Sequence, residues 1–257
     1  MPAFSQLNVL LLPGRELDRR VFDLFSNRRK PRANTGRIQM NAFNSCFTPV
    51  RSIGLTLMAL VPLTAMAQSA NPPDLEKRVT TPAMADDLLK QVEAQVGSLC
   101  GLTVSGRVDL KLVDRQEMDA LYRGSYAGAE IGLYRRGPGG RHEIYVMKGL
   151  SVGMCAGIMA HEYTHAWQSE HCLPHLSPIL REGFARWVEA KYCEKVGART
   201  MLWCINEEAD PISGVPEPVY GVGYKTMTGW EAKWGAPGLV KLVQHITTVE
   251  EGQTANP

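Results

Sequence analysis

Two histidines and a glutamate occur in one short run whose spacing suits metal chemistry. The run is His161-Glu162-Tyr163-Thr164-His165, which has the form H-E-x-x-H. On a helix, residues four apart share a face, so both imidazoles can bind one ion. Zinc is the expected ion, because it accepts imidazole and carboxylate ligands and has no redox chemistry. A catalytic zinc keeps one position for water, and Glu162 is then the expected general base.

The same run is also compatible with a helix whose two histidines are ordinary surface or core residues. Its surroundings favour the metal site over this alternative. Apolar residues precede the run at helical positions and a tryptophan follows it, which places the run in a helix that packs in a core. These residues are Met154, Cys155, Ile158, Met159 and Trp167.

A catalytic site needs a third protein ligand, and three downstream residues are candidates. His171 falls where the extended H-E-x-x-H-x-x-G-x-x-H pattern has its third histidine, but Gln168 replaces the glycine that lets the chain turn there. His175 matches no pattern. Glu182 is the favoured ligand, because a ligand on the next predicted helix is held by packing. His171 and His175 are then expected to be loop residues; a site without a third protein ligand is the remaining alternative.

Other roles around the ion can be assigned to small sets of residues. A transition-state oxyanion needs a second donor beside the metal, and Tyr220, Tyr224 and His245 are candidates that are equally compatible with structural roles. A carboxylate should orient each metal-bound histidine, and Glu189 is one candidate. The strand His142–Met147 is expected to lie at a sheet edge, along which a substrate pairs.

The elements that must position these residues follow from periodicity. Helical spacing predicts helices over 82–97, 154–168, a segment opened by Ser177-Pro178, 221–234 and 237–248. Alternation predicts strands over 102–113, 131–135 and 143–147, the last two joined as a hairpin by Gly137-Pro138-Gly139-Gly140. The order of helix, small sheet and further helices indicates an α+β domain. A stripe on the helix after Ser177 is expected to face the core: Leu180, Phe184, Trp187, Val188 and the stem of Lys191.

An apolar stretch from Ile53 to Ala65 has the marks of a secretory signal peptide. Arg51 precedes it, and Ala65-Met66-Ala67 supplies a small-residue cleavage site. Because such leaders span about 15–30 residues, Met40 is the expected start, although Met1 remains an alternative. We therefore predict a signal peptide over 40–67, an over-extended or disordered segment over 1–39, a linker over 68–80, a metallopeptidase domain over 81–249 and a tail over 250–257.

The charge of the chain is divided unevenly. The 257 residues carry a net charge of +2, but residues 1–67 contain nine Lys/Arg and three Asp/Glu, whereas the rest contains 19 and 23. The predicted mature protein is thus mildly acidic, which argues against nucleic-acid binding. A basic run at Arg28-Arg29-Lys30-Pro31-Arg32 allows the alternative of an arm that binds nucleic acid or membrane. No apolar stretch reaches the roughly 18 residues that span a bilayer.

Cysteines are compatible with export. Cys46 would leave with the leader, and no C-x-x-C pair occurs. An oxidising compartment would permit two disulfides and one thiol among the remaining cysteines, although several can equally be small buried apolar residues. These are Cys100, Cys155, Cys172, Cys193 and Cys204.

The segment from Ala156 to Trp167, followed by Leu176 and Glu182-Gly183, resembles a known peptidase domain. It is that of the plant organ-size-regulating metallopeptidases, which carry LIM domains and are activated by ubiquitin. The sixteen residues between His165 and Glu182 match the spacing of that family. The resemblance covers roughly residues 100–248 and includes Gly132–Arg135, Gly149-Leu150, Tyr220–Tyr224, Trp234-Gly235 and Leu239–Ile246.

The resemblance implies a zincin-like single domain of the gluzincin type, with a small sheet and hairpin followed by an active-site helix and C-terminal helices. It also implies one zinc ion held by His161, His165 and Glu182, with Glu162 as catalytic base. No segment of this sequence resembles the LIM or ubiquitin-binding modules of the family. Ubiquitin activation and the plant substrates are therefore not implied.

The predicted function is that of a zinc endopeptidase, exported to the periplasm or secreted, which hydrolyses protein or peptide substrates and keeps no membrane span after signal cleavage. One rival is a non-catalytic zinc-binding interaction protein, although a structural site needs no base such as Glu162. A second rival is a zinc amidohydrolase that acts on a non-protein amide, such as a cell-wall amide. The cleavage specificity and the oligomeric state are not predicted.

Overall fold

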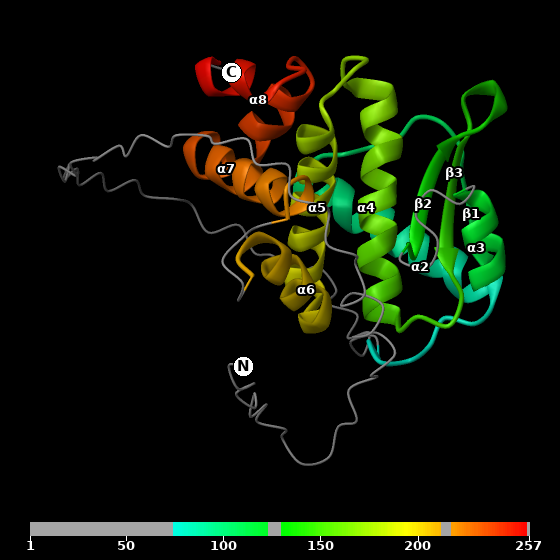
Figure 1. The fold of residues 1–257 in the computed structure, drawn as a ribbon. Helices are drawn as coiled ribbons and strands as arrows, with labels where there is room; N and C mark the ends of the chain where they lie inside the picture. The colour runs from blue at the N-terminus through cyan, green and yellow to red at the C-terminus, as the bar shows by residue number, and fades with distance from the viewer. Residues whose placement is uncertain (1–73, 123–129, 212–216, 256–257) are drawn as a thin grey trace, which may run out of the picture. The chain divides into compact units, whose positions relative to one another are not determined.

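The computed structural model describes residues 74–122, 130–211 and 217–255, all within the unit Pro73–Pro257 (Figure 1). The predicted N-terminal segment 1–39, the signal peptide 40–67 and the start of the linker 68–80 lie outside the described residues. No helix in the described part of the chain is both long and apolar enough to cross a membrane.

The described residues form helices and one small sheet, which confirms the predicted α+β class. The first half of the described chain contains the sheet and two helices. In chain order, its elements are α2 (Pro82–Cys100), β1 (Val108–Val113), α3 (Arg115–Leu121), β2 (Gly132–Arg136), a 3-10 turn (Pro138–Gly140) and β3 (His142–Met147). Five helices follow: α4 (Val152–His171), α5 (Pro178–Val196), α6 (Arg199–Ala209), α7 (Tyr220–Val243) and α8 (Val249–Thr254). Periodicity missed the short helices α3, α6 and α8, and α8 occupies part of the predicted tail.

The sheet has the strand order β1-β3-β2. β2 and β3 form the predicted antiparallel hairpin, with Gly132 opposite Val146, while β1 runs parallel to β3, with Val108 opposite His142. The prediction that His142–Met147 is an edge strand is therefore wrong. Strands on both sides pair with β3, and its nearly continuous buried run is typical of a central strand. The edge next to the hairpin belongs to β2.

The predicted strand over 102–113 is confirmed only from Val108 onward. Its first residues satisfy their backbone N–H groups with side chains of α4 instead of a neighbouring strand. The N–H of Val104 donates to the Tyr163 hydroxyl at 3.1 Å, and the N–H groups of Ser105 and Gly106 donate to the Glu170 carboxylate at 2.7 and 2.8 Å. Upstream, α2 continues past the predicted end at 97 to Cys100.

Helix α4 lies between the sheet and α5 (Figure 1). Most of its residues are buried on every side, so this is a core helix and not a surface helix. It starts at the N-cap Ser151, and α5 starts at the predicted N-cap Ser177 with Pro178 in its first turn. The predicted core stripe of α5 is confirmed, since Leu180, Phe184, Trp187 and Val188 are fully buried. Lys191 lies over the Trp187 ring with its amine paired to Glu231 at 2.8 Å.

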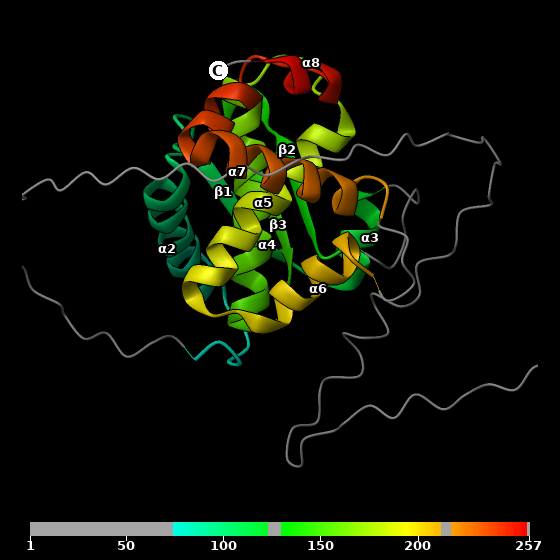
Figure 2. The same cartoon turned by 90° about the vertical axis from the view of Figure 1, so that its left-hand side faces the viewer.

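Helix α7 crosses α5 (Figure 2), and two glycines meet at the crossing. A Cβ on Gly183 would lie 2.5 Å from the backbone of Gly223, and a Cβ on Gly223 would lie 2.5 Å from the Ile179 carbonyl oxygen. Only glycines allow the two helix backbones to approach so closely. The two predicted C-terminal helices are the two parts of α7, which breaks at Gly235 just before Pro237 and ends at Val243 instead of residue 248.

The five cysteines of the described residues form no disulfide. Cys100, Cys155 and Cys193 are buried, and Cys172 and Cys204 are half-buried. Burial raises the pKa of Cys100 and Cys155 to about 12, so these thiols stay protonated and pack as small apolar groups. The structure therefore agrees with the alternative in which the cysteines fill the core.

We expect the substitution Gly223→Ala to destabilise the protein by about 1–3 kcal/mol, because the added methyl group would force α5 and α7 apart. Gly229→Ala is the matched control on the same helix, since nothing lies within 4 Å of the position that its methyl group would take and alanine favours a helix by about 1 kcal/mol. Urea unfolding of the two variants measures the difference. Equal stability of the two variants would show that the helix crossing does not require glycine.

Candidate metal centre

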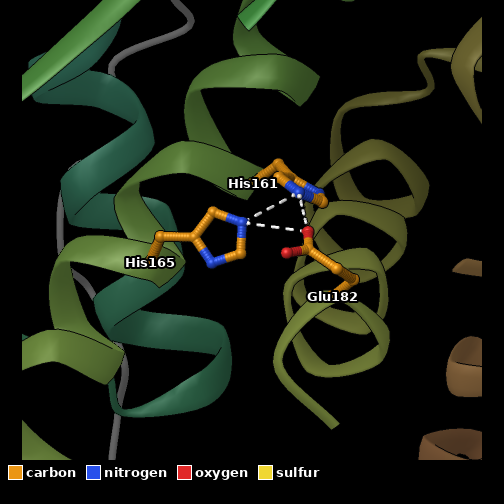
Figure 3. Close-up of side chains that lie close together, drawn as sticks. All are labelled: His161, His165 and Glu182. Atoms are coloured by element: carbon orange, nitrogen blue, oxygen red, sulfur yellow. Dashed lines mark hydrogen bonds and ion pairs between the residues drawn. The ribbon is translucent and has the colours of Figure 1, made fainter. Parts of the chain in front are cut away.

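Three side chains from two helices converge on one point (Figure 3). His161 and His165 come from successive turns of α4, and Glu182 comes from the second turn of α5. The Nε2 atoms of the two histidines lie 3.2 Å apart, and the Oε2 atom of Glu182 lies 3.4 Å from His161 Nε2 and 3.2 Å from His165 Nε2. The structure therefore brings together the three residues that the sequence favoured as metal ligands.

The spacing of the three donor atoms fits a tetrahedral metal ion. Bonds of about 2.0–2.1 Å at tetrahedral angles place neighbouring donor atoms roughly 3.3 Å apart. The three measured separations of 3.2, 3.2 and 3.4 Å agree with this edge length. Two imidazoles and one carboxylate also form a donor set common in catalytic metal sites. The group can therefore hold one metal ion without rearrangement.

The three ligands are not sealed from solvent. The side chains of His161, His165 and Glu182 are 9%, 12% and 13% exposed. Three donors are one fewer than a closed tetrahedral structural site uses, and no fourth donor joins the cluster among the described residues. An ion bound here would keep a position for water or substrate.

Glu189 on α5, a candidate that the sequence offered for this role, orients His161. Its Oε2 atom lies 3.1 Å from His161 Nδ1 and accepts a hydrogen bond from Arg186 Nη1 at 2.6 Å. Burial raises the pKa of Glu189, but the adjacent Arg186 charge outweighs burial and lowers it. Because an ionised carboxylate only accepts, His161 must carry a proton on Nδ1, which leaves Nε2 as the nitrogen that can bind a metal ion. Arg186 also binds the Glu208 carboxylate of α6 at 2.9 and 3.0 Å.

Gln168 orients His165, so the second histidine has a carboxamide partner where a carboxylate was expected. The Gln168 Oε1 atom lies 2.8 Å from His165 Nδ1, and its Nε2 donates to the Arg181 carbonyl oxygen at 2.9 Å. Gln168 is the residue that departs from the extended zinc-binding pattern at its glycine position. The departure has a structural role, because the side chain joins α4 to α5.

His171 and His175 lie outside the cluster, as expected. His171 ends α4, stacks on the Trp167 ring and places its Nδ1 atom 3.0 Å from the Trp167 carbonyl oxygen. It is thus a helix residue and not the loop residue that the sequence indicated. His175 is exposed and follows α4 with a positive φ of 71°.

Glu162 lies beside the ligands and against β2. It is 8% exposed and accepts no hydrogen bond from any residue that the structure describes. Burial raises the pKa of Glu162, and the nearby His161 and His165 lower it by a smaller amount. A Cβ on Gly132 would lie 2.7 Å from Glu162 Oε1, so the strand backbone passes directly over the carboxylate. A buried carboxyl group with a raised pKa and no competing donor is suited to proton transfer.

The structure separates the three candidates for an oxyanion donor. The Tyr220 ring lies 6.2 Å from the His161 ring and stacks on the Arg186 guanidinium at 5.0 Å. The charged neighbours of Tyr224 include Glu194 and Lys191, which are not metal ligands. Burial raises the pKa of Tyr224, the charge of Glu194 raises it further, and the charge of Lys191 lowers it. The side chain of His245, beyond the end of α7, makes no contact with the metal ligands among the described residues. Tyr220 alone of the three lies at the site.

Sequence reasoning missed Tyr122, which follows α3. Its hydroxyl donates to the Gly132 carbonyl oxygen at 2.7 Å. Burial is the largest cause that raises the pKa of Tyr122, and the negative charge of Glu162 raises it further. The residue therefore lies near Glu162 and fixes the start of β2. No motif marks it, because the contact depends on how α3 folds back toward the hairpin.

A second network, also missed, holds the other end of β2 against α4. The Tyr134 hydroxyl donates to Ser169 Oγ at 2.8 Å and lies 2.9 Å from His142 Nδ1. His142 Nε2 lies 2.8 Å from Glu170 Oε1. Through this network α4, which supplies two ligands, fixes the position of the edge strand. The Tyr134 ring also lies 6.3 Å from the His165 ring.

Comparison with known protein families, characterised proteins and solved structures finds no match to this chain. The resemblance to the plant metallopeptidases therefore remains a prediction from short motifs.

We expect Glu170→Gln to destabilise the metal-free protein at pH 7 by roughly 1–2 kcal/mol, because an amide cannot accept from both backbone N–H groups. Burial raises the pKa of Glu170, but the hydrogen bonds from Ser105, Gly106 and His142 outweigh it and lower the pKa to about 2. A lowered carboxyl pKa stabilises the fold above the ordinary value of 4.5, and this stabilisation is lost as the pH falls toward 2. Urea unfolding with chelator should show the difference between wild type and variant shrinking between pH 5 and about pH 2. A difference independent of pH would contradict the assignment.

Proposed function

We propose that this protein is a zinc-dependent endopeptidase of the gluzincin type. The observation that carries the proposal is the placement of Glu162 beside a partly exposed cluster of three ligands. A structural zinc site needs neither an open position nor a base. The short donor separations suit zinc, and the ligand set also suits it chemically. The motif resemblance described above supports the same class.

The proposed chemistry divides between the ion and the residues around it. A bound zinc ion would polarise the scissile carbonyl and lower the pKa of water. Glu162 accepts the proton of the attacking water and then passes it to the leaving amine, for which its raised pKa is suited. Tyr220 donates a hydrogen bond to the oxyanion that develops on the substrate. Glu189 and Gln168 hold the two imidazoles in the productive orientation.

The free edge of β2 supports a polypeptide as substrate. β3 is the only strand that pairs with β2 in the described part of the chain. An extended peptide added along the other edge of β2 would pass Gly132, whose backbone lies against the Glu162 carboxylate. Pairing of backbone groups would hold such a peptide without demanding a particular side chain. The edge strand β2 thus takes the role expected of the strand His142–Met147, which is paired on both sides.

The proposed site of action is outside the cytoplasm, in the periplasm or in the extracellular medium. This proposal rests on the sequence over 40–67, which has the form of a signal peptide.

We expect Glu162→Gln to retain zinc and to lower kcat/KM for peptide cleavage by about 10²–10⁴-fold, because the amide cannot take up the proton. The substrate is a mixed peptide library, analysed by mass spectrometry for cleavage sites, and zinc content is measured on the same samples. Zinc-loaded wild-type protein that cleaves no peptide would contradict the proposal and favour a binding protein or a hydrolase of non-protein amides.

We expect Tyr220→Phe to lower kcat by about 10²–10³-fold with little change in KM, since it would remove a donor used mainly in the transition state. Tyr224→Phe is the matched control, one turn further along α7 and next to Lys191 instead of the ligands. Steady-state kinetics on one peptide substrate measures both variants. An equal effect of the two substitutions would remove Tyr220 from the mechanism.

A further inference from the structure

Gln168 makes two hydrogen bonds that connect the two metal-binding helices. The residue is 6% exposed and lies on the same face of α4 as His161 and His165, three positions after the second histidine. Its Oε1 atom contacts His165 Nδ1 at 2.8 Å, and its Nε2 atom donates to the Arg181 carbonyl oxygen of α5 at 2.9 Å. Arg181 directly precedes the third ligand, Glu182.

These two contacts fix each other. The Arg181 carbonyl oxygen can only accept a hydrogen bond, so the NH₂ group of Gln168 must face it and the oxygen of the amide must face His165. That oxygen can only accept, so His165 must carry its proton on Nδ1. The lone pair of His165 Nε2 then points at the metal position. The tautomer of a ligand on α4 is thus determined by a backbone carbonyl of α5.

The Arg181 side chain extends this hydrogen-bond network to the third ligand. Its Nε atom donates to Glu182 Oε1 at 3.0 Å, while Glu182 Oε2 faces the two imidazoles at 3.2 and 3.4 Å. The guanidinium therefore occupies one carboxylate oxygen and leaves the other for the ion. The hydrogen-bond network thus connects His165 to Glu182 through Gln168 and Arg181.

We propose that Gln168 is a positioning residue that holds His165 and Glu182 together in the arrangement that binds the metal ion. The proposal rests on the metal site of the proposed function but not on peptide hydrolysis. The first histidine has an independent partner in Glu189, so the two histidines are controlled by different side chains. A displacement of α5 would move Glu182 out of the site, and it would also remove the Arg181 carbonyl that orients the Gln168 amide toward His165.

The test measures binding of Zn²⁺ and Co²⁺ alone to the full chain. We expect Gln168→Met, which keeps the volume but removes both hydrogen bonds, to weaken Zn²⁺ binding by roughly 10–100-fold in competition with a chelating dye. Gln91→Met is the matched control, because Gln91 is an exposed glutamine on α2. The ligand-field absorption of bound Co²⁺ reports the coordination geometry and should differ from wild type in Gln168→Met but not in Gln91→Met.

Gln168→Glu separates the two hydrogen bonds. A carboxylate still accepts from His165 Nδ1 but cannot donate to the Arg181 carbonyl, so Zn²⁺ binding should recover relative to Gln168→Met while the Co²⁺ spectrum stays unlike that of wild type. Equal Zn²⁺ affinities of Gln168→Met and wild type would overturn the proposal, and so would a wild-type Co²⁺ spectrum in Gln168→Glu. Wild-type protein that binds Zn²⁺ but cleaves no peptide would contradict the proposed hydrolase and leave this coupling intact.

Discussion

The structure depends on holding two imidazoles and one carboxylate at a single, largely buried point. Each group has a second polar atom that must also be satisfied, because an unpaired buried donor or acceptor costs about 1–3 kcal/mol. The fold meets this requirement with a different partner for each ligand: Glu189 for His161, Gln168 for His165 and Arg181 for Glu182. All three connections involve α5, so the packing of α4 against α5 and the assembly of the ligand set are one event.

The packing around these helices follows from that requirement. Helix α4 can direct its ligands inward because the sheet, α2 and α5 cover it on its other sides. Helix α5 is fixed in turn by α7, whose approach at Gly183 and Gly223 brings the backbones into contact. The same approach places Tyr220, the first residue of α7, beside His161. The position of the metal ligands and of Tyr220 thus depends on a backbone contact between two glycines.

Local patterns in the sequence predicted the parts of the site that depend on one helix or on adjacent helices. The spacing of His161 and His165, the cap at Ser177 and the position of Glu182 are all set within short segments, and the structure brings the ligands together. Pairing partners in the sheet were not predictable, since β1 joins β3 across α3 and β2. The residues 102–107 alternate like a strand, but hydrogen bonds to Tyr163 and Glu170, both distant in sequence, replace the strand ladder. The role of Gln168 was not predictable for a similar reason, because it depends on a hydrogen bond to the Arg181 carbonyl oxygen on the next helix.

The balance of charge explains why a divalent cation suits this particular core. Around His161 the four carboxylates of Glu162, Glu182, Glu189 and Glu208 outnumber the two guanidinium groups of Arg181 and Arg186, which leaves a formal excess of two negative charges. Without an ion, burial lowers the pKa of His161, but Glu182 and Glu189 outweigh burial and raise it to about 10. A proton on His161 therefore neutralises part of the excess in the metal-free protein. A dication bound to the three ligands would neutralise all of it and release that proton, so metal binding would complete the electrostatics of the core as well as the coordination of the ion.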